Sequence, residues 1–381
     1  MGKDILTRKI DLRLPAGQSC FLWGPRKSGK SYWIRQHLPQ ARVIELLKTD
    51  TFAEYAARPA LLRERHTGAR GLIVIDEVQK IPALLDEVQS MIAEEKAQFL
   101  LTGSSARKLR RGHANLLGGR AWRRVMMPLS ATEVTGFRLE EAMVSGMLPP
   151  HFLSAHPREE LRAYVADYLK EEIAAEASAR QIPAFAEFLR VAALSSSELI
   201  HYTNLARETG ISQRTVRDYF DILEDTFLGF RLAPWTRSRK RRMILTEKFY
   251  FFDVGLAGYL AGRHPVPGNA DFGKAFEHFL LMELRAYQAY RAPEMPIRYW
   301  RASTGPEVDF ILGEKDLAVE IKSGRVHEGD LRGLRALQED GPVRRTLLVC
   351  TEKEPRKLAG AIEILPWQIF LDRLWGGALI G

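Results

Sequence analysis

The sequence predicts an α/β protein whose first part is a parallel sheet built around a phosphate-binding loop. The apolar run 21–23 leads into Gly24-x-x-x-x-Gly29-Lys30-Ser31, which is typical of a strand, a glycine-rich loop and the start of a helix. A second apolar run, 72–75, ends in the carboxylates Asp76-Glu77. Strand-like runs alternate with helical patterns up to residue 105. This alternation indicates a parallel sheet covered on both faces, with ligands at the carboxyl ends of its strands.

The elements of this first part follow in order along the chain. Glycines at 68 and 71 interrupt the pattern before the apolar run 72–75. Ile81-Pro82 then opens a helix with apolar residues at helical spacing. We expect strands at 19–23, 41–46, 72–76, 99–105 and 125–127, and helices at 30–38, 51–66 and from 81 onward.

The glycine-rich loop has the residue types that ATP binding needs. Glycine lets backbone N–H groups approach the phosphates, Lys30 reaches the β- and γ-phosphates, and the Ser31 hydroxyl ligates Mg²⁺. The expected nucleotide-binding residues are the whole loop: Gly24, Pro25, Arg26, Lys27, Ser28, Gly29, Lys30 and Ser31.

The neighbouring strand ends complete the predicted ATPase site. Asp76 is expected to hold Mg²⁺ together with Ser31, and Glu77 to polarise the attacking water. Thr102 and Ser104 follow the next strand, where their hydroxyls are placed to sense the γ-phosphate or position the water. The alternative for these two residues is a simple strand-end turn.

Arg120 is the predicted residue that completes the site of a neighbouring subunit. It follows Gly119 and precedes the strand expected at 125–127, and a guanidinium there stabilises charge in the transition state. Arg123 and Arg124 are competitors for this role.

Composition describes a water-soluble protein of two to four domains. The chain has 381 residues, with 46% hydrophobic and 27% charged residues, and no apolar run long enough to span a membrane. The N-terminus lacks the apolar core of a signal peptide, and the two cysteines have no metal or redox spacing, so we expect a cytoplasmic protein. A net charge of +9 favours a polyanionic partner, and basic residues concentrate in 107–124 and 231–248.

The region 140–190 is helical in pattern, and a helix, a Gly210 turn and a second helix follow at 203–220. In such a helix-turn-helix, the outward residues near the start of the second helix contact DNA. Here these are Gln213, Arg214 and Arg217. The alternative is a helix pair used only for packing.

A basic run lies between two apolar segments after these helices, as in the wing of a winged helix. Five cations in this run are expected to contact DNA phosphates: Arg237, Arg239, Lys240, Arg241 and Arg242. The alternative is a solvated loop.

A second group of charged residues lies in the C-terminal part. Glu277 is in a predicted helix, Asp309 in an apolar strand, and Glu320 and Lys322 on one face of the next strand. Two carboxylates, Asp309 and Glu320, are the expected ligands of Mg²⁺ here, with Lys322 orienting a water or stabilising the phosphorus centre, as in a nuclease. The alternative is a structural salt bridge from Lys322.

These motifs together resemble those of the prokaryotic AAA-type P-loop ATPases that carry a C-terminal PD-(D/E)XK nuclease-like, resolvase-like domain. The resembling motifs are Gly24 to Ser31, Ile75 to Pro82, Leu101 to Ser105, Gly119-Arg120, Pro128-Leu129-Ser130-x-x-Glu133, Phe249 to Leu256, Glu307 to Phe310 and Glu320-Ile321-Lys322. Gly146-Met147-Leu148-Pro149 departs from the Gly-Gly-x-Pro usual in the family.

The resemblance implies that the chain has four parts. It also implies assembly through the nucleotide sites into a homo-oligomer, either a ring such as a hexamer or a smaller assembly. The parts are an ATPase core at 1–135, a helical lid at 136–190, a winged helix at 191–265 and a restriction-endonuclease-like α/β domain at 266–381. We expect an ATP- and Mg²⁺-dependent ATPase that remodels branched or duplex DNA, with metal-dependent cutting at the C-terminal site. The rival hypothesis is a nucleotide-dependent switch or scaffold whose degenerate nuclease fold serves only for binding.

Overall fold

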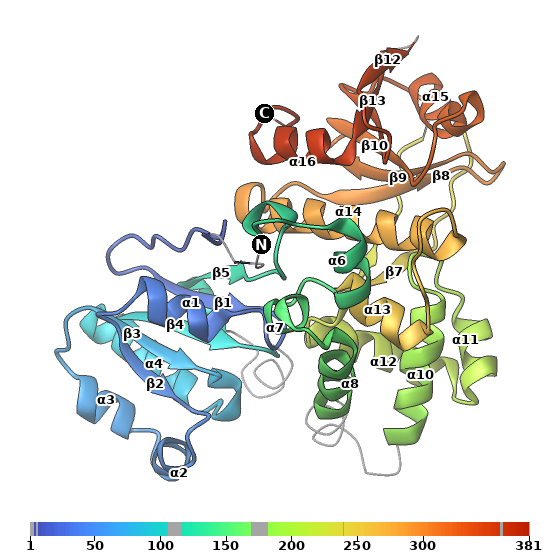
Figure 1. The fold of residues 1–381 in the computed structure, drawn as a ribbon. Helices are drawn as coiled ribbons and strands as arrows, with labels where there is room; N and C mark the ends of the chain where they lie inside the picture. Colours follow the sequence, from blue (N-terminus) through green and yellow to red (C-terminus); the bar gives the residue numbers. More distant parts are fainter. Residues whose placement is uncertain are drawn as a thin grey trace. The chain divides into compact units, whose positions relative to one another are not determined.

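The chain forms two compact units in the computed structural model, which describes residue 4 and residues 7–105, 116–168, 182–238, 240–358 and 361–380 (Figure 1). The smaller unit is Lys9–Pro128 with Asp225–Leu228, and the larger unit is Met1–Arg8, Leu129–Glu224 and Gly229–Gly381. The predicted boundaries at 190 and 265 fall inside the larger unit. None of the described helices is both long and apolar enough to cross a bilayer.

The smaller unit is a five-stranded, all-parallel sheet with strand order β2-β3-β4-β1-β5. Its strands are β1 (Ser19–Trp23), β2 (Arg42–Glu45), β3 (Leu72–Asp76), β4 (Gln98–Gly103) and β5 (Ala121–Val125). Its helices are α1 (Lys30–His37), α2 (Thr49–Ala57), α3 (Leu61–His66) and α4 (Leu84–Glu95), with short 3₁₀ turns η1 (Val78–Lys80) and η2 (Leu116–Gly119).

The hydrophobic core of this unit lies between the sheet and the helices that pack on it. Phe21, Ile75 and Leu101 are buried together with Leu84 and Val88 of α4. This packing explains the apolar runs in the sequence, because central strands of a parallel sheet are buried on both faces.

Two expected elements of the smaller unit are wrong in detail. The helix expected at 51–66 is two helices, because Pro59 disfavours helical backbone at Arg58. The fifth strand begins at Ala121 and ends at Val125, earlier than the expected 125–127. Arg123 and Arg124 are therefore residues of an edge strand, where charged side chains are common.

Helices form the first part of the larger unit. They are α6 (Leu139–Ser145), α7 (Pro149–Leu153), α8 (Pro157–Tyr168), α10 (Ile182–Leu194), α11 (Tyr202–Thr209), α12 (Gln213–Asp225) and α13 (Val254–Ala261), with a 3₁₀ turn η3 at Ala131–Glu133. Where α13 meets α6, a Cβ on Gly255 would lie 2.1 Å from the Gly146 nitrogen, so only glycine fits. Ser212 caps the start of α12, with its Oγ accepting from the Thr215 nitrogen at 3.1 Å.

An antiparallel pair follows the helix-turn-helix, as in a winged helix. It is formed by β6 (Gly229–Leu232) and β7 (Lys248–Phe251). The connection between these strands lies along the C-terminal sheet: the Trp235 nitrogen donates to the Tyr299 oxygen at 2.6 Å, and the Ile244 nitrogen donates to the Arg301 oxygen at 3.0 Å. The basic segment is therefore held on the C-terminal sheet along much of its length.

The C-terminal part is a mixed six-stranded sheet with order β12-β13-β11-β10-β9-β8. The strands are β8 (Ile297–Arg301), β9 (Glu307–Leu312), β10 (Leu317–Lys322), β11 (Thr346–Cys350), β12 (Arg356–Leu358) and β13 (Ile362–Pro366). The remaining elements are α14 (Ala270–Arg291), α15 (Arg332–Glu339), α16 (Trp367–Trp375) and the 3₁₀ turn η6 (Glu328–Leu331). β13 ends at Pro366, and α16 begins directly after it at Trp367.

Two hydrophobic clusters cover opposite faces of this sheet. α14 and α16 pack on one face, where Phe276, Phe370 and Val319 are buried together, and α15 packs on the other with Leu334 and Ala318 (Figure 1). The sheet is therefore the middle layer of an α/β sandwich.

Candidate nucleotide site and C-terminal carboxylate centre

The predicted phosphate loop connects β1 to α1 in the smaller unit. Gly24 has a φ of 150°, and a Cβ there would lie 2.4 Å from the Met126 oxygen. Lys27 and Gly29 have φ values of 61° and 96°. This left-handed backbone turns the loop sharply into the helix, whose N-terminus is a favourable place for phosphate.

Lys30 is buried at the centre of the loop. Its Nζ donates to the Gly24 oxygen at 2.8 Å and to the Pro25 oxygen at 2.9 Å. Burial lowers the pKa of Lys30, and the nearby Glu77 and Asp76 carboxylates partly oppose this. An incoming phosphate would take the place of the two carbonyl oxygens and supply the negative charge that the buried ammonium lacks.

Asp76 brings the two halves of the predicted site together. The Ser31 hydroxyl donates to Asp76 Oδ2 at 2.8 Å, and the Thr102 hydroxyl donates to Asp76 Oδ1. Mg²⁺ prefers such hydroxyl and carboxylate oxygens. Ser31 and Asp76 are therefore the residues that would hold the ion, which neutralises phosphate charge when it is bound.

Glu77 lies beside Asp76 in an unusual backbone conformation, with a φ of 62°. Its nitrogen donates to Thr102 Oγ1 at 3.1 Å, and its Oε2 accepts from the Ser104 hydroxyl at 3.1 Å. The two expected hydroxyl residues are thus in contact with the expected carboxylates. Their contacts are more specific than those of a simple strand-end turn.

Gln79 is a residue of this site that sequence reasoning missed. Its Nε2 donates to Glu77 Oε2 and, at 3.2 Å, to Ser104 Oγ, while its side chain is buried. A Cβ on Gly103 would lie 2.6 Å from Gln79 Oε1, so the glycine leaves room for this amide. Gln79 therefore orients the carboxylate that the sequence assigns to the water.

The remaining residues of the loop and Arg120 lie at the positions expected from the sequence. Ser28 is buried inside the turn, Arg26 is half-buried and Lys27 is exposed. Arg120 is exposed directly before β5, where its nitrogen donates to the Leu117 oxygen at 2.9 Å. Its side chain is therefore accessible to solvent.

The expected DNA-contacting residues of the helix-turn-helix differ in their surroundings. Gln213 and Arg214 are exposed in the first turn of α12. The Arg217 guanidinium lies 3.8 Å from the centre of the Tyr202 ring, which ties α12 to α11. Arg217 is exposed as well, so all three residues are accessible, and Arg217 also holds α12 against α11.

The basic run is partly paired with acidic residues of the C-terminal part. Arg237 contacts Glu314 at 2.7 Å, and Arg241 contacts Glu339 at 2.6 Å. Within the described chain, Lys240 and Arg242 form no ion pair, and Arg239 lies outside the described residues. Arg237 stays exposed in its ion pair, whereas the Arg241 side chain is only 26% exposed.

The C-terminal charged residues form a buried group around Asp309, which interacts electrostatically with both Glu277 and Glu320. Asp309 Oδ2 accepts from the Ile321 nitrogen at 2.8 Å, and Lys322 Nζ lies 2.6 Å from Glu320 Oε1. Burial raises the pKa of Asp309, with Lys248 and Lys322 opposing the rise. We call Glu277, Glu307, Asp309 and Glu320 the C-terminal carboxylate centre.

Sequence reasoning missed Glu307 as a member of this centre and Lys248 as a cation that contacts it. Lys248 Nζ lies 2.5 Å from Glu307 Oε1 and 4.0 Å from Glu277 Oε1. Among the residues that the structure describes, no group of three or more His, Cys, Asp or Glu side chains is arranged to hold a metal ion. Glu307 and Glu277 therefore already face the ammonium group of Lys248.

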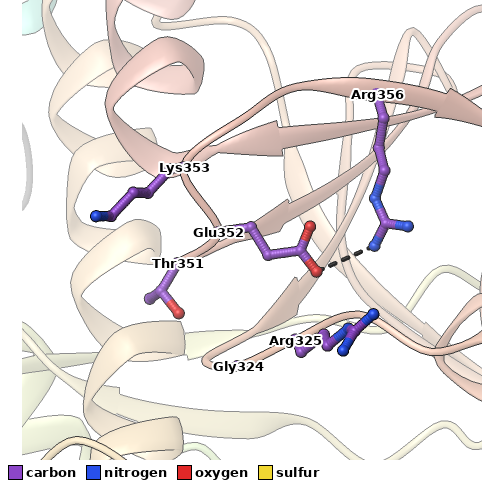
Figure 2. A pocket seen from close by; sticks show the side chains of 6 residues that line it. All are labelled: Gly324, Arg325, Thr351, Glu352, Lys353 and Arg356. Carbon is purple, nitrogen blue, oxygen red and sulfur yellow. Dashed lines mark hydrogen bonds and ion pairs between the residues drawn. The ribbon is translucent and has the colours of Figure 1, made fainter.

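A basic pocket lies at the carboxyl ends of β10 and β11, as Figure 2 shows. Its volume is about 540 Å³, and Glu352 Oε1 in its wall accepts from Arg356 at 3.0 Å. The cations that line it are Arg325, Lys353 and Arg356. Carboxyl ends of parallel strands are common ligand sites, so these cations are further candidates for contacting an anion.

Comparison with protein families identifies the first part of the chain. Residues 17–135 match the model described as "AAA domain". This segment is therefore similar to AAA domains. Residues 136–266 and 272–370 match two domains of unknown function, DUF8612 and DUF4143, and neither description names a nuclease.

Similar sequences occur in several bacteria. Uncharacterized proteins of Mycobacterium tuberculosis and Mycobacterium bovis are each 28% identical over 315 residues, which cover 79% of this chain and 69% of theirs. An uncharacterized protein of Haemophilus influenzae is 22% identical over 294 residues, covering 68% of this chain and 72% of its own. The similarity thus extends well beyond the AAA segment.

Solved structures with some likeness include two proteins of Aeropyrum pernix. The ORC1 protein in complex with DNA has a TM-score of 0.28 and 12% identity, covering 64% of this chain and 86% of its own. The ORC2 protein, in ADPNP–ADP complexes, has a TM-score of 0.24 and 11% identity, covering 71% and 90%. The DNA and nucleotides belong to those proteins.

Proposed function

We propose that this protein is an ATP-hydrolysing, DNA-binding machine that remodels branched or otherwise structured DNA as a homo-oligomer. One observation supports the proposed ATPase activity. Five residues lie together around the phosphate loop of the segment that is similar to AAA domains, namely Lys30, Ser31, Asp76, Glu77 and Thr102. Lys30 binds phosphate, Ser31 and Asp76 hold Mg²⁺, and Glu77 removes a proton from the attacking water.

The DNA part of the proposal rests on charge and on the helix-turn-helix. The chain carries a net charge of +9, and Arg214 lies exposed at the start of α12 beside Gln213. Lys240, Arg242 and the basic pocket add cations in the same unit. Phosphate contacts from such cations bind DNA of any sequence, so shape rather than sequence would select the substrate.

The C-terminal carboxylate centre is proposed to support binding rather than cutting. Its carboxylates already contact Lys248, Lys322 and Arg301, the last at 3.2 Å from Glu307 Oε2. This observation favours a degenerate nuclease fold over the metal-dependent nuclease that the resemblance implies.

Measuring ATP turnover with single-stranded, duplex, forked and four-way DNA tests the proposed function. Turnover should rise when DNA is added, and it should rise most with branched DNA. The stimulation should weaken as salt increases, because DNA binding releases counterions and this release is less favourable at high salt. Turnover that ignores every DNA would instead support a nucleotide-dependent switch or scaffold that responds to a protein partner.

Arg120→Ala is expected to keep ATP binding and lose most ATP turnover. An arginine acting across a subunit boundary is worth about 10³-fold or more in turnover. Mixing Arg120→Ala with Glu77→Gln subunits should restore activity, because some mixed interfaces have both residues intact. No recovery on mixing, with full activity of a dilute wild-type monomer, would exclude this role.

Neutralising Lys240 and Arg242 is expected to weaken binding to every DNA. The slope of log affinity against log salt should flatten by roughly one unit per lost phosphate contact. Arg237→Gln with Arg241→Gln is the matched control, because these two residues are already ion-paired and should change the slope less. Equal effects of the two pairs would contradict this assignment.

A further inference from the structure

Lys248 is a buried cation that contacts the C-terminal carboxylate centre from β7. It begins β7, next to the helix-turn-helix, whereas Glu277 lies on α14 and Glu307 begins β9. Its side chain is only 5% exposed, and its Nζ contacts Glu307 at 2.5 Å. A lysine buried this deeply requires carboxylate partners to remain charged.

The carboxylate oxygens around Lys248 are largely occupied by protein donors. Glu277 Oε1 accepts from the Tyr250 hydroxyl at 2.6 Å in addition to facing Lys248. Glu307 is shared between Lys248 and Arg301. A divalent ion bound by Glu277 and Glu307 would have to displace these donors and lie close to the ammonium, which repels it.

The charges of the centre are nearly balanced without a metal. Lys248, Lys322 and Arg301 face the four carboxylates, and the Oε2 atom of Glu320 is buried without a hydrogen-bond partner. These three cations therefore offset most of the negative charge of the centre without a metal.

We propose that Lys248 is the resident cation of the C-terminal carboxylate centre and takes the place of a divalent metal, so that the centre works without one. Lys248 also joins β7 to the C-terminal sheet through a buried ion pair. This inference goes beyond the proposed ATPase function, which requires no particular state of this centre.

Titration calorimetry with MnCl₂ on the full chain, without nucleotide, tests the proposal. The wild type and Asp309→Asn should give the same heats, because any weak binding at the phosphate loop is common to both. Lys248→Met should gain one Mn²⁺ site, and Lys248→Met with Asp309→Asn should lose it again. Lys274→Met, which breaks an ion pair with Glu198 on the surface of the same unit, is the matched control and should gain none.

Thermal unfolding provides a second readout for the same variants. Lys248→Met should melt below the wild type, because its buried carboxylates lose their cation, and saturating Mn²⁺ should raise its midpoint by roughly 5 °C or more. Mn²⁺ should shift the midpoints of the wild type and of Asp309→Asn by the same amount.

Two results would overturn the proposal. One is Mn²⁺ binding by the wild type that disappears in Asp309→Asn, and this comparison stands even if Lys248→Met fails to fold. The other is a Lys248→Met protein that melts like the wild type and binds no Mn²⁺. DNA-stimulated ATP turnover is measured separately, so either result leaves the proposed function to its own test.

Discussion

Glu77→Gln is expected to bind ATP normally and to turn it over at least about 100-fold more slowly, the low end of the range for loss of a general base. Its Oε2 accepts hydrogen bonds from Ser104 and Gln79, which hold the carboxylate at the strand end. The amide cannot accept the proton of the attacking water. Steady-state turnover and equilibrium binding of a fluorescent ATP analogue separate the two effects.

Lys30→Ala should fail at the earlier step, because the buried ammonium is the group that meets the phosphates. ATP binding, and turnover with it, should disappear. Glu54→Gln is the control, since Glu54 pairs with Arg65 on the exposed surface of the same unit and should match the wild type. Normal turnover by Glu77→Gln would remove Glu77 from the proposed chemistry.

Glu283→Ala is expected to destabilise the larger unit by about 3 kcal/mol or more at pH 5, because it leaves buried donors without an acceptor and opens a cavity. Glu283 is buried on α14, where its Oε1 accepts from the Ala131 nitrogen at 2.6 Å and its Oε2 from the Ser130 hydroxyl at 2.7 Å. Trp375 donates to the same Oε2 at 3.2 Å. One carboxyl group thus ties η3 and α16 to α14.

The cost of Glu283→Ala should shrink as pH rises. Burial raises the pKa of Glu283 to about 7, although the hydrogen bonds from Ala131, Ser130 and Trp375 oppose the rise. The folded state therefore binds this proton more tightly than the unfolded state, so its contribution is complete below about pH 4.5 and is lost as pH rises through about 7. This rise in the pKa of Glu283, from 4.5 to about 7, corresponds to roughly 3 kcal/mol in the free energy of unfolding.

Urea unfolding at pH 5 and pH 8 measures this difference. Glu283→Gln cannot titrate, so its stability should change less with pH than that of the wild type. Glu187→Ala, which breaks an exposed pair with Arg190, should have little effect at either pH. Parallel pH profiles for the wild type and Glu283→Gln would show that Glu283 keeps an ordinary pKa.

The sequence alone determined the nucleotide site, and the reason is local. The motif from Gly24 to Ser31 is a continuous strand, loop and helix, and each residue's role depends on its neighbours in the chain. The contacts of Asp76 with Ser31 and Thr102 could be predicted as well. Parallel strands bring their carboxyl ends to one edge, so strand-end residues meet without further information.

Local patterns were less informative where a residue's partner lies far along the chain. Pro128-Leu129-Ser130-x-x-Glu133 was predicted only as a family motif, yet Ser130 and Glu133 form a capping box whose Ser130 also binds Glu283. The strand at 121–125 was missed because Arg123 and Arg124 interrupt its apolar pattern, as is possible in an edge strand.

Only the tertiary structure decided what surrounds the C-terminal carboxylates. Asp309, Glu320 and Lys322 could be grouped from strand spacing, but Lys248 and Glu307 meet across a hairpin and a sheet that are distant in sequence. The same packing pairs Arg237 and Arg241 with acidic residues of the C-terminal part. Sequence spacing cannot predict such pairs, because their distance depends on how separate elements pack. These pairs determine whether a charged residue is available to a ligand.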